Sequence, residues 1–112
     1  TKKAGNFEVA RAGWIGDYND ASTMLDLLTT THGNNDGKYS NAEYDQLLHD
    51  ARTMKDPAQN YNAAEEIAIE QDMAVAPIYQ YTTKRLVKPY VGGYMPNPED
   101  NIYTRDMYII AH

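Results

Sequence analysis

The shortage of large aliphatic side chains is the feature that most restricts what this chain can fold into. Leu, Ile, Val and Phe together supply 18 of its 112 residues, and a charged chain with less than roughly 20 % of these types has the composition of a disordered segment. Ten tyrosines and five methionines replace part of the missing apolar surface, although each buried tyrosine hydroxyl needs a hydrogen-bond partner. The chain is therefore either weakly stable by itself or a piece of something larger.

The charge balance and the lack of a long apolar run exclude two classes of partner. Acidic residues outnumber Lys and Arg by 16 to 10, which gives a net charge of −6. Nucleic-acid binding requires clustered basic side chains that neutralise phosphates, and the cluster of Lys84, Arg85 and Lys88 is too short. No apolar run approaches the ~20 residues of a membrane-spanning helix. We expect no nucleic-acid partner and no direct membrane insertion.

The start of the chain resembles the middle of a longer polypeptide. It opens Thr1-Lys2-Lys3-Ala4-Gly5-Asn6, without a methionine and with no apolar segment behind the two lysines, so it is not a secretory signal peptide. This opening fits a cut made inside a longer chain. The absence of cysteine excludes disulfides, a thiol nucleophile and Cys-type zinc sites, but it assigns no compartment.

The first third of the chain predicts a strand, a loop and a helix. Alternation of apolar and polar side chains over 6–14 indicates a half-buried strand. The glycines and Asx residues of 13–20 predict a loop. Asn19 or Asp20 can cap a following helix, whose apolar face would comprise Met24, Leu25, Leu27 and Leu28.

Two further helices are predicted by their start signals. Ser40-Asn41-Ala42-Glu43 matches a capping box, in which the serine hydroxyl would accept from the third amide of the helix. Asp56-Pro57 predicts a second start, with Asp56 as cap and Pro57 in the first helical position, and an end near Asp72. The apolar side chains follow at helical spacing: Tyr44, Leu47, Leu48 and Ala51 in the first helix, and Tyr61, Ala64, Ile67 and Ala68 in the second.

The last third predicts extended structure. The apolar and aromatic run 74–81 indicates a strand with Pro77 near its start. Prolines and glycines make 89–101 irregular, and alternation over 102–110 predicts a closing strand. The resulting order of one strand, three helices and two more strands indicates an α/β fold with a mixed sheet.

A calcium-loop pattern occupies 32–43, where Asn34, Asp36, Gly37, Ser40 and Glu43 take suitable loop positions. The first position is His32, where calcium needs a carboxylate, and the capping box already accounts for Glu43. We interpret this segment as a connection between helices, with a calcium-binding hairpin as an alternative. His49 and His112 lack metal-ligand spacing, so we expect no metal site and no cofactor.

No catalytic set is evident. Ser22 and Ser40 lie beside predicted helix starts and outside any nucleophile elbow, and no Ser–His–Asp combination can be assembled. The carboxylates that could form catalytic pairs lie on polar helix faces or at helix ends; they are Asp36, Glu43, Glu65, Glu66 and Asp72. We therefore expect no catalytic residues and do not expect an enzyme.

The segment Arg11-Ala12-Gly13-Trp14-Ile15-Gly16-Asp17-Tyr18 is the strongest candidate site. It holds the single tryptophan between a cation and an anion, and an extended chain spans about 3.3 Å per residue. Such a segment could bind a zwitterion, with Arg11 at its carboxylate, Asp17 at its ammonium and the main chain pairing between them. Alternatively, Arg11 forms a surface salt bridge, Asp17 an Asx-turn, and Trp14 belongs to a core.

The residues 11–19 resemble the peptide-contacting segment of periplasmic oligopeptide-binding proteins, the solute-binding subunits of peptide ABC importers. The resemblance extends over essentially the whole chain, through 61–65, 76–81, 85–89, 92–94 and 103–110. The segments 14–18, 79–81 and 97–100 are more similar to the murein tripeptide-binding branch of the family.

The resemblance implies roles for particular residues. Asp17 would pair with the α-ammonium of a peptide, and Arg11 would meet its carboxylate when the peptide is short. The backbone of Gly13, Trp14 and Ile15 would bind the peptide main chain as an added strand, with Trp14 forming the wall of a side-chain pocket. Tyr81 would also line the site.

The resemblance also implies an architecture and a location. Family members have two lobes, so 1–82 would be part of the C-terminal peptide-binding lobe and 83–112 the crossover and closing strand that returns to the N-terminal lobe. The partners would be a short peptide, a membrane ABC permease and the remainder of the same polypeptide. The location would be the periplasm of a Gram-negative bacterium, with a signal peptide outside this segment. The alternative is a self-contained, small acidic protein-interaction module without a ligand pocket.

Overall fold

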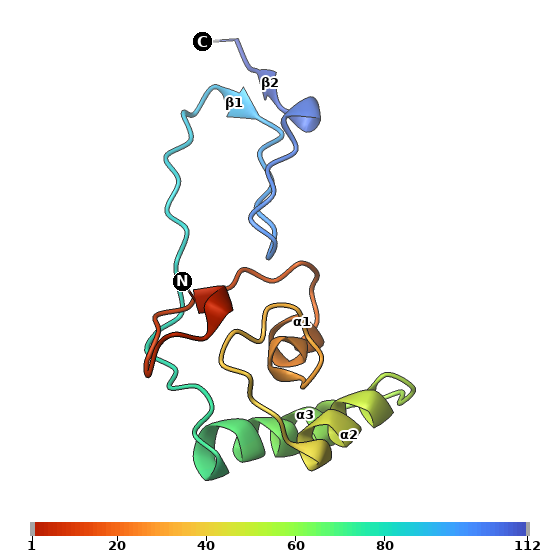
Figure 1. Cartoon of the computed structure of the whole chain (residues 1–112). Helices are drawn as coiled ribbons and strands as arrows, with labels where there is room; N and C mark the ends of the chain where they lie inside the picture. Colours follow the sequence, from red (N-terminus) through yellow and green to blue (C-terminus); the bar gives the residue numbers. More distant parts are fainter. Residues whose placement is uncertain (1, 112) are drawn as a thin grey trace.

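The computed structural model describes residues 2–111. Its regular elements are short, and most of them lie in the first two thirds of the chain (Figure 1). In chain order they are the 3-10 helix η1 (Lys2–Ala4), α1 (Ser22–Leu25), the 3-10 helix η2 (Asp26–Leu28), α2 (Ala42–Ala51), α3 (Ala58–Glu65), the π-helix η3 (Glu66–Gln71), β1 (Val91–Gly92), the 3-10 helix η4 (Thr104–Asp106) and β2 (Tyr108–Ile109).

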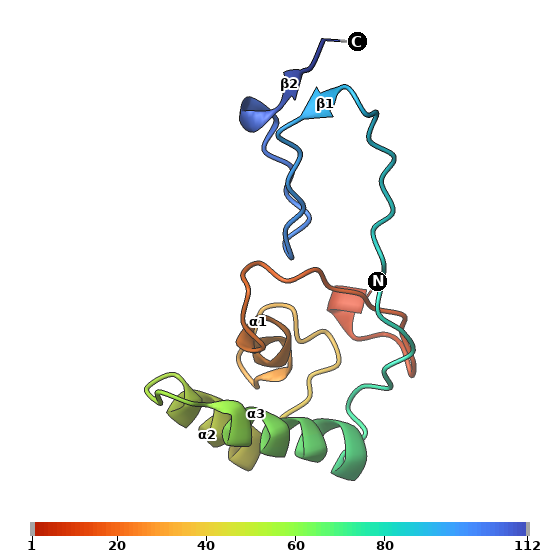
Figure 2. The same cartoon turned by 180° about the vertical axis from the view of Figure 1, so that it is seen from behind.

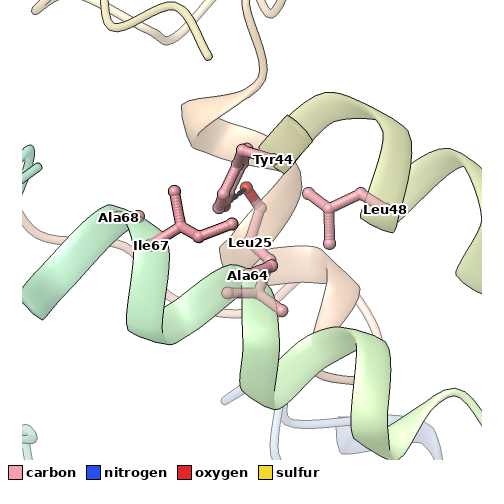
Figure 3. Close-up of a cluster of buried hydrophobic side chains, with 6 residues drawn as sticks. All are labelled: Leu25, Tyr44, Leu48, Ala64, Ile67 and Ala68. Carbon is pink, nitrogen blue, oxygen red and sulfur yellow. Dashed lines mark hydrogen bonds between the residues drawn. The ribbon is translucent and has the colours of Figure 1, made fainter. Parts of the chain in front are cut away.

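The three α-helices pack together in what we call the helical body, residues 20–72 (Figure 2). Its core forms where α1, α2, α3 and η3 meet (Figure 3). Tyr44 is fully buried there, and its hydroxyl donates to the carbonyl of Leu25 at 2.6 Å, which satisfies the polar group that burial would otherwise penalise. The buried apolar cluster consists of Leu25, Tyr44, Leu48, Ala64, Ile67 and Ala68.

Helix α2 begins as predicted, but its cap is Asn41 rather than Ser40. The Asn41 side-chain oxygen accepts from the amides of Glu43 at 2.9 Å and Tyr44 at 3.1 Å. A cap residue keeps an extended backbone immediately before the first helical residue, and Asn41, with φ −144° and ψ 118°, meets that condition. The Ser40 hydroxyl instead lies 3.1 Å from the hydroxyl of Thr30.

The start of α3 is displaced by one position from the prediction. Pro57 occupies the cap position rather than the first helical position, while Asp56 accepts from the amide of Ala58 at 3.2 Å. The helical segment continues through η3, where the amide of Asp72 donates to the carbonyl of Ile67 at 2.9 Å. Its predicted end near Asp72 is therefore confirmed.

The predicted strands are wrong at 6–14 and 74–81, and the strand predicted over 102–110 is reduced to Tyr108 and Ile109. A strand requires a neighbour that completes its hydrogen-bond ladder, and within residues 2–111 the first two segments have none. The sheet is two-stranded and antiparallel, not mixed, with Val91 opposite Ile109 and Gly92 opposite Tyr108. Strand β1 lies within 89–101, the stretch that was predicted to be irregular.

Residues 82–111 form what we call the C-terminal arm. The chain leaves the helical body as a single extended segment, reaches β1, and then loops back before entering β2 (Figure 1, blue). The molecule is elongated, with extents of 58 × 39 × 22 Å and a radius of gyration of 18.4 Å. Between residues 2 and 111, no helix has the length and apolar character needed to cross a membrane.

Two glycines shape the turn that follows β1. Gly93 has φ +75°, which favours glycine, and a Cβ at this position would collide with the carbonyl of Asp106. A Cβ on Gly92 would enter the ring of Tyr108. Glycines therefore allow the two strands and η4 to approach one another.

Candidate functional site

The candidate site is centred on residues 11–17, which we call the binding segment. It has no regular secondary structure, and its Arg11, Trp14, Ile15 and Asp17 are exposed. Trp14 is 38 % exposed, so it is not the core tryptophan of the alternative interpretation. The segment thus presents both main-chain groups and side chains to solvent.

Arg11 is held by two tyrosines from the end of the 74–81 run. Its Nη2 donates to the hydroxyl of Tyr81, and the hydroxyl of Tyr79 lies 3.5 Å from the same nitrogen. The two tyrosine rings lie 4.7 Å apart between centroids. These contacts give the guanidinium a defined position, while neither tyrosine neutralises its charge.

Tyr81 also lies beside the binding segment at Gly13. A Cβ built on Gly13 would lie 3.6 Å from the Tyr81 ring, so the ring lies close to the bare glycine backbone. The hydrogen bond with Tyr79 raises the pKa of the Tyr81 phenol, which keeps it neutral and able to donate or accept. The structure thereby brings Gly13, Arg11 and Tyr81 together.

Tyr79 was not among the site residues predicted from the sequence. Its signal was available, because alternate residues of an extended chain project to the same side, and Tyr79 and Tyr81 are two apart. Together with Arg11 they border a hollow of about 360 Å³. The remaining lining residues are Ala12, Val75, Ala76, Pro77 and Ile78.

Asp17 is held through its main chain. Its amide donates to the hydroxyl of Thr23 at 2.9 Å, while its carboxylate takes part in no hydrogen bond or ion pair within residues 2–111. The carboxylate is therefore available to a cationic group from outside this chain.

Arg11 and Asp17 differ in this respect from Arg52 and Arg85. In the described part of the chain, neither belongs to an ion pair, so the salt-bridge alternative for Arg11 is not supported. In contrast, Arg52 lies 3.4 Å from Asp26 and Arg85 lies 2.6 Å from Asp100. The Asp100 contact raises the pKa of Arg85. One exposed segment thus carries an unpaired cation and an unpaired anion, as a zwitterionic ligand would require.

The residues of the calcium-like segment 32–43 are engaged in other contacts. His32 Nδ1 accepts from the amide of Asn34 at 3.2 Å, Asp36 lies 3.7 Å from Lys2, and Glu43 is in the first turn of α2. Residues 2–111 contain no group of three or more acidic or histidine side chains placed to hold a metal ion. His112 lies outside the described residues.

The amino-acid sequence of the chain is similar to those of periplasmic peptide-binding proteins. The chain is 50 % identical over its whole length to the periplasmic murein peptide-binding protein MppA of Escherichia coli, of which it covers 21 %. It is 43 % identical over its whole length to the periplasmic oligopeptide-binding protein OppA of Haemophilus influenzae, again covering 21 % of that protein. The chain thus spans about a fifth of the length of these relatives. No family model matches it.

Solved structures of periplasmic peptide-binding proteins also match the fold of this chain. The Escherichia coli murein tripeptide-binding protein MppA matches 99 % of this chain, with 22 % of its own length covered, a TM-score of 0.84 and 50 % identity. The Haemophilus influenzae OppA complex with the peptide RPPGFSPFR matches 98 % of this chain, with 22 % of its own length covered, a TM-score of 0.83 and 43 % identity. These relatives are solute-binding proteins and not enzymes. The 112 residues therefore match, over their whole length, the C-terminal portion of a periplasmic oligopeptide-binding protein.

Proposed function

We propose that this chain supplies one face of the peptide site of a periplasmic solute-binding protein, which carries short peptides to a membrane ABC importer. The observation that carries the proposal is the binding segment, with Arg11 and Asp17 exposed and unpaired in the described structure. The relatives named for peptide or murein-peptide binding support it. A murein tripeptide is our candidate ligand.

The proposed mode of binding follows from the chemistry of the segment. Asp17 pairs with the α-ammonium of the peptide, and Arg11 with the carboxylate of a short one. The backbone at Gly13, Trp14 and Ile15 adds the peptide as a strand, which reads no side chains and so permits broad specificity. Trp14 borders a side-chain pocket, and Tyr81 fixes Arg11. The two charges then select for peptide length.

We further propose that these residues are part of a larger, two-lobed protein. Residues 1–82 would belong to the peptide-binding lobe and 83–112 to the crossover and closing strand to a second lobe, within the same polypeptide. Closure of two lobes excludes water, and charge pairing is much stronger in a site of low dielectric. The protein would reside in the periplasm of a Gram-negative bacterium, with its signal peptide outside this segment.

The elongated shape favours this proposal over a self-contained interaction module. A compact domain of ~100 residues has a radius of gyration of about 13 Å, whereas this chain has 18.4 Å. Residues 73–111 include no buried side chain. A module that functions alone would be expected to cover more of its apolar surface.

The test is peptide binding by the full-length protein that carries this sequence. Asp17→Asn should weaken tripeptide binding by about 2 kcal/mol, the size of a hydrogen bond to a charged group, as measured by isothermal titration calorimetry. Glu70→Gln, an exposed change on η3, serves as the control. An unchanged dissociation constant for Asp17→Asn would remove Asp17 from the site.

The 112-residue chain alone gives a second test. With no opposing lobe, Arg11 and Asp17 stay solvated, so we expect weak tripeptide binding or none. Micromolar binding by the isolated chain, measured by the same calorimetry, would contradict the role proposed for lobe closure.

A further inference from the structure

Thr23, at the start of α1, is a buried polar residue that none of the peptide-contacting roles uses. It is 7 % exposed, and with Asn35 it makes up the buried polar residues of the described chain. Its side chain faces the end of the binding segment, six residues earlier in the sequence. Both halves of this forked side chain make contacts there.

The hydroxyl of Thr23 accepts from the amide of Asp17 at 2.9 Å. The methyl group packs against Gly16, because a Cβ on that glycine would lie 3.0 Å from Thr23 Cγ2. Thr23 is itself fixed, since its amide donates to the carbonyl of Asp20 at 3.2 Å. The side chain therefore holds the two consecutive residues that end the binding segment.

A second contact ties this turn to the helical body. The Asp20 carboxylate accepts from the amide of Ser22 at 2.9 Å and from the hydroxyl of Tyr61, on α3, at 3.0 Å. Hydrogen bonds from Ser22 and Tyr61 lower the pKa of Asp20, so it remains an acceptor at neutral pH. The turn that presents Asp17 is thus attached to a helix that contributes to the core.

We propose that Thr23 is a positioning residue for peptide binding: its hydroxyl fixes the main chain of Asp17 and thereby directs the Asp17 carboxylate toward the α-ammonium group of the peptide. This inference rests on the proposed function. An ion pair with an ammonium group gains most when the carboxylate is held in place before the ligand arrives, because less conformational freedom is lost on binding. Thr23 does not itself contact the peptide.

The forked side chain provides a matched pair of variants. Thr23→Val keeps the shape and removes the hydrogen bond, whereas Thr23→Ser keeps the hydroxyl and removes the methyl group. In the full-length protein, titrated calorimetrically with trialanine, we expect Thr23→Val to weaken binding about five-fold, the ratio a single neutral hydrogen bond supports. Thr23→Ser should bind within about two-fold of the parent. Equal affinities for all three proteins would overturn the inference.

The Asp17→Asn background separates this inference from the proposed function. If Thr23 acts through the Asp17 carboxylate, Thr23→Val should cause little further loss once that carboxylate is gone. A full five-fold loss in this background would overturn the positioning role and leave the peptide site intact. If Asp17→Asn alone leaves affinity unchanged, the proposed function fails, and the inference fails with it.

Gly16→Ala is a second probe that does not depend on the folding of Thr23→Val. Its new methyl would press on Thr23 Cγ2, so it should displace Asp17 and weaken trialanine binding. Combining it with Thr23→Ser removes the opposing methyl and should recover part of the loss. Weaker binding by Gly16→Ala without recovery in the double variant would count against the inference.

Discussion

The helical body and the C-terminal arm belong to one chain, yet the first buries apolar side chains and the second leaves them exposed. In the helical body, Tyr44 and Leu48 are buried in a common core (Figure 3). In the arm, Leu86 is fully exposed and no side chain is buried. The two regions therefore differ in burial and not in aliphatic content: Leu, Ile, Val and Phe supply 7 residues of 20–72 and 6 residues of 82–111, yet only the helical body has a core.

Two leucine substitutions test this contrast directly, and one of them should have the largest effect on stability. Leu48→Ala removes buried methyl groups and should cost about 2–5 kcal/mol of unfolding free energy. Leu86→Ala is the matched control on the arm and should cost almost nothing. Urea unfolding of the 112-residue chain, followed by far-ultraviolet circular dichroism, measures both. Equal costs would mean that the arm has a core after all.

A second test changes the arm alone. Gly93→Ala places a side chain at φ +75° and against the carbonyl of Asp106, at a cost of about 1–2 kcal/mol from the backbone conformation alone. We expect the pairing of Val91 with Ile109 to be lost while the helices remain. Gly33→Ala, where a Cβ meets open space, is the control. Nuclear Overhauser contacts across the two strands report the result, and their persistence in Gly93→Ala would contradict the close approach.

A third, smaller effect concerns the cap of α2 in the helical body. Asn41→Ala removes the acceptor of two helix amides and should destabilise the chain by about 1 kcal/mol. Ser40→Ala, one residue earlier, should have a much smaller effect because its hydroxyl caps no helix amide in the structure. Thermal or urea unfolding measures both losses. A larger loss of stability in Ser40→Ala than in Asn41→Ala would support the serine cap that the sequence pattern predicted.

The smallest effect is a pH dependence at Asp72, which joins the end of the helical body to the segment just before α2. Its carboxylate accepts from the Tyr39 hydroxyl at 2.6 Å and from the Asn41 amide at 2.8 Å, and these bonds lower the pKa of Asp72 from its usual 3.8. The stabilisation is therefore complete above pH 3.8 and declines as the pH falls through the lower, folded value.

Tyr39 gives the alkaline counterpart of this effect. Burial, together with the bond to Asp72, raises the pKa of Tyr39 from 10.0 to about 12, so its contribution is present below pH 10 and is lost as the pH rises toward 12. Asp72→Asn should flatten the acid limb of a stability–pH curve and Tyr39→Phe the alkaline limb. Glu70→Gln is the control for both, and a similar flattening in that variant would contradict the assignment.

The sequence predicted the helices better than the strands. Local signals located α2 and α3 because a helix closes its hydrogen bonds within a few residues and shows its buried face as a 3.6-residue period. The errors at Ser40 and Pro57 are one-residue shifts of a cap. Where Met24 was expected on an apolar face, it is exposed, because α1 is a single turn in which Leu25 supplies the contact with the core.

The site was predicted residue by residue, but not its contacts. The pattern of Arg11 and Asp17 around a tryptophan indicated a zwitterion site, and the structure adds that both are unpaired within the described residues. The support of Arg11 by Tyr79 and of Asp17 by Thr23 joins residues 68 and 6 positions apart. Sequence spacing alone did not reveal either contact, because each depends on how a loop folds onto its neighbours.

What the sequence determined by itself was the set of helices, the chemistry of the binding segment and the resemblance of the whole chain to periplasmic peptide-binding proteins. These depend on short-range periodicity and on the identity of neighbouring residues. The tertiary structure alone decided which residues form the core, which strands pair and which charges stay free. Those outcomes depend on distant partners: a strand needs a neighbour to complete its ladder, and a charge is available only where no opposite charge folds against it.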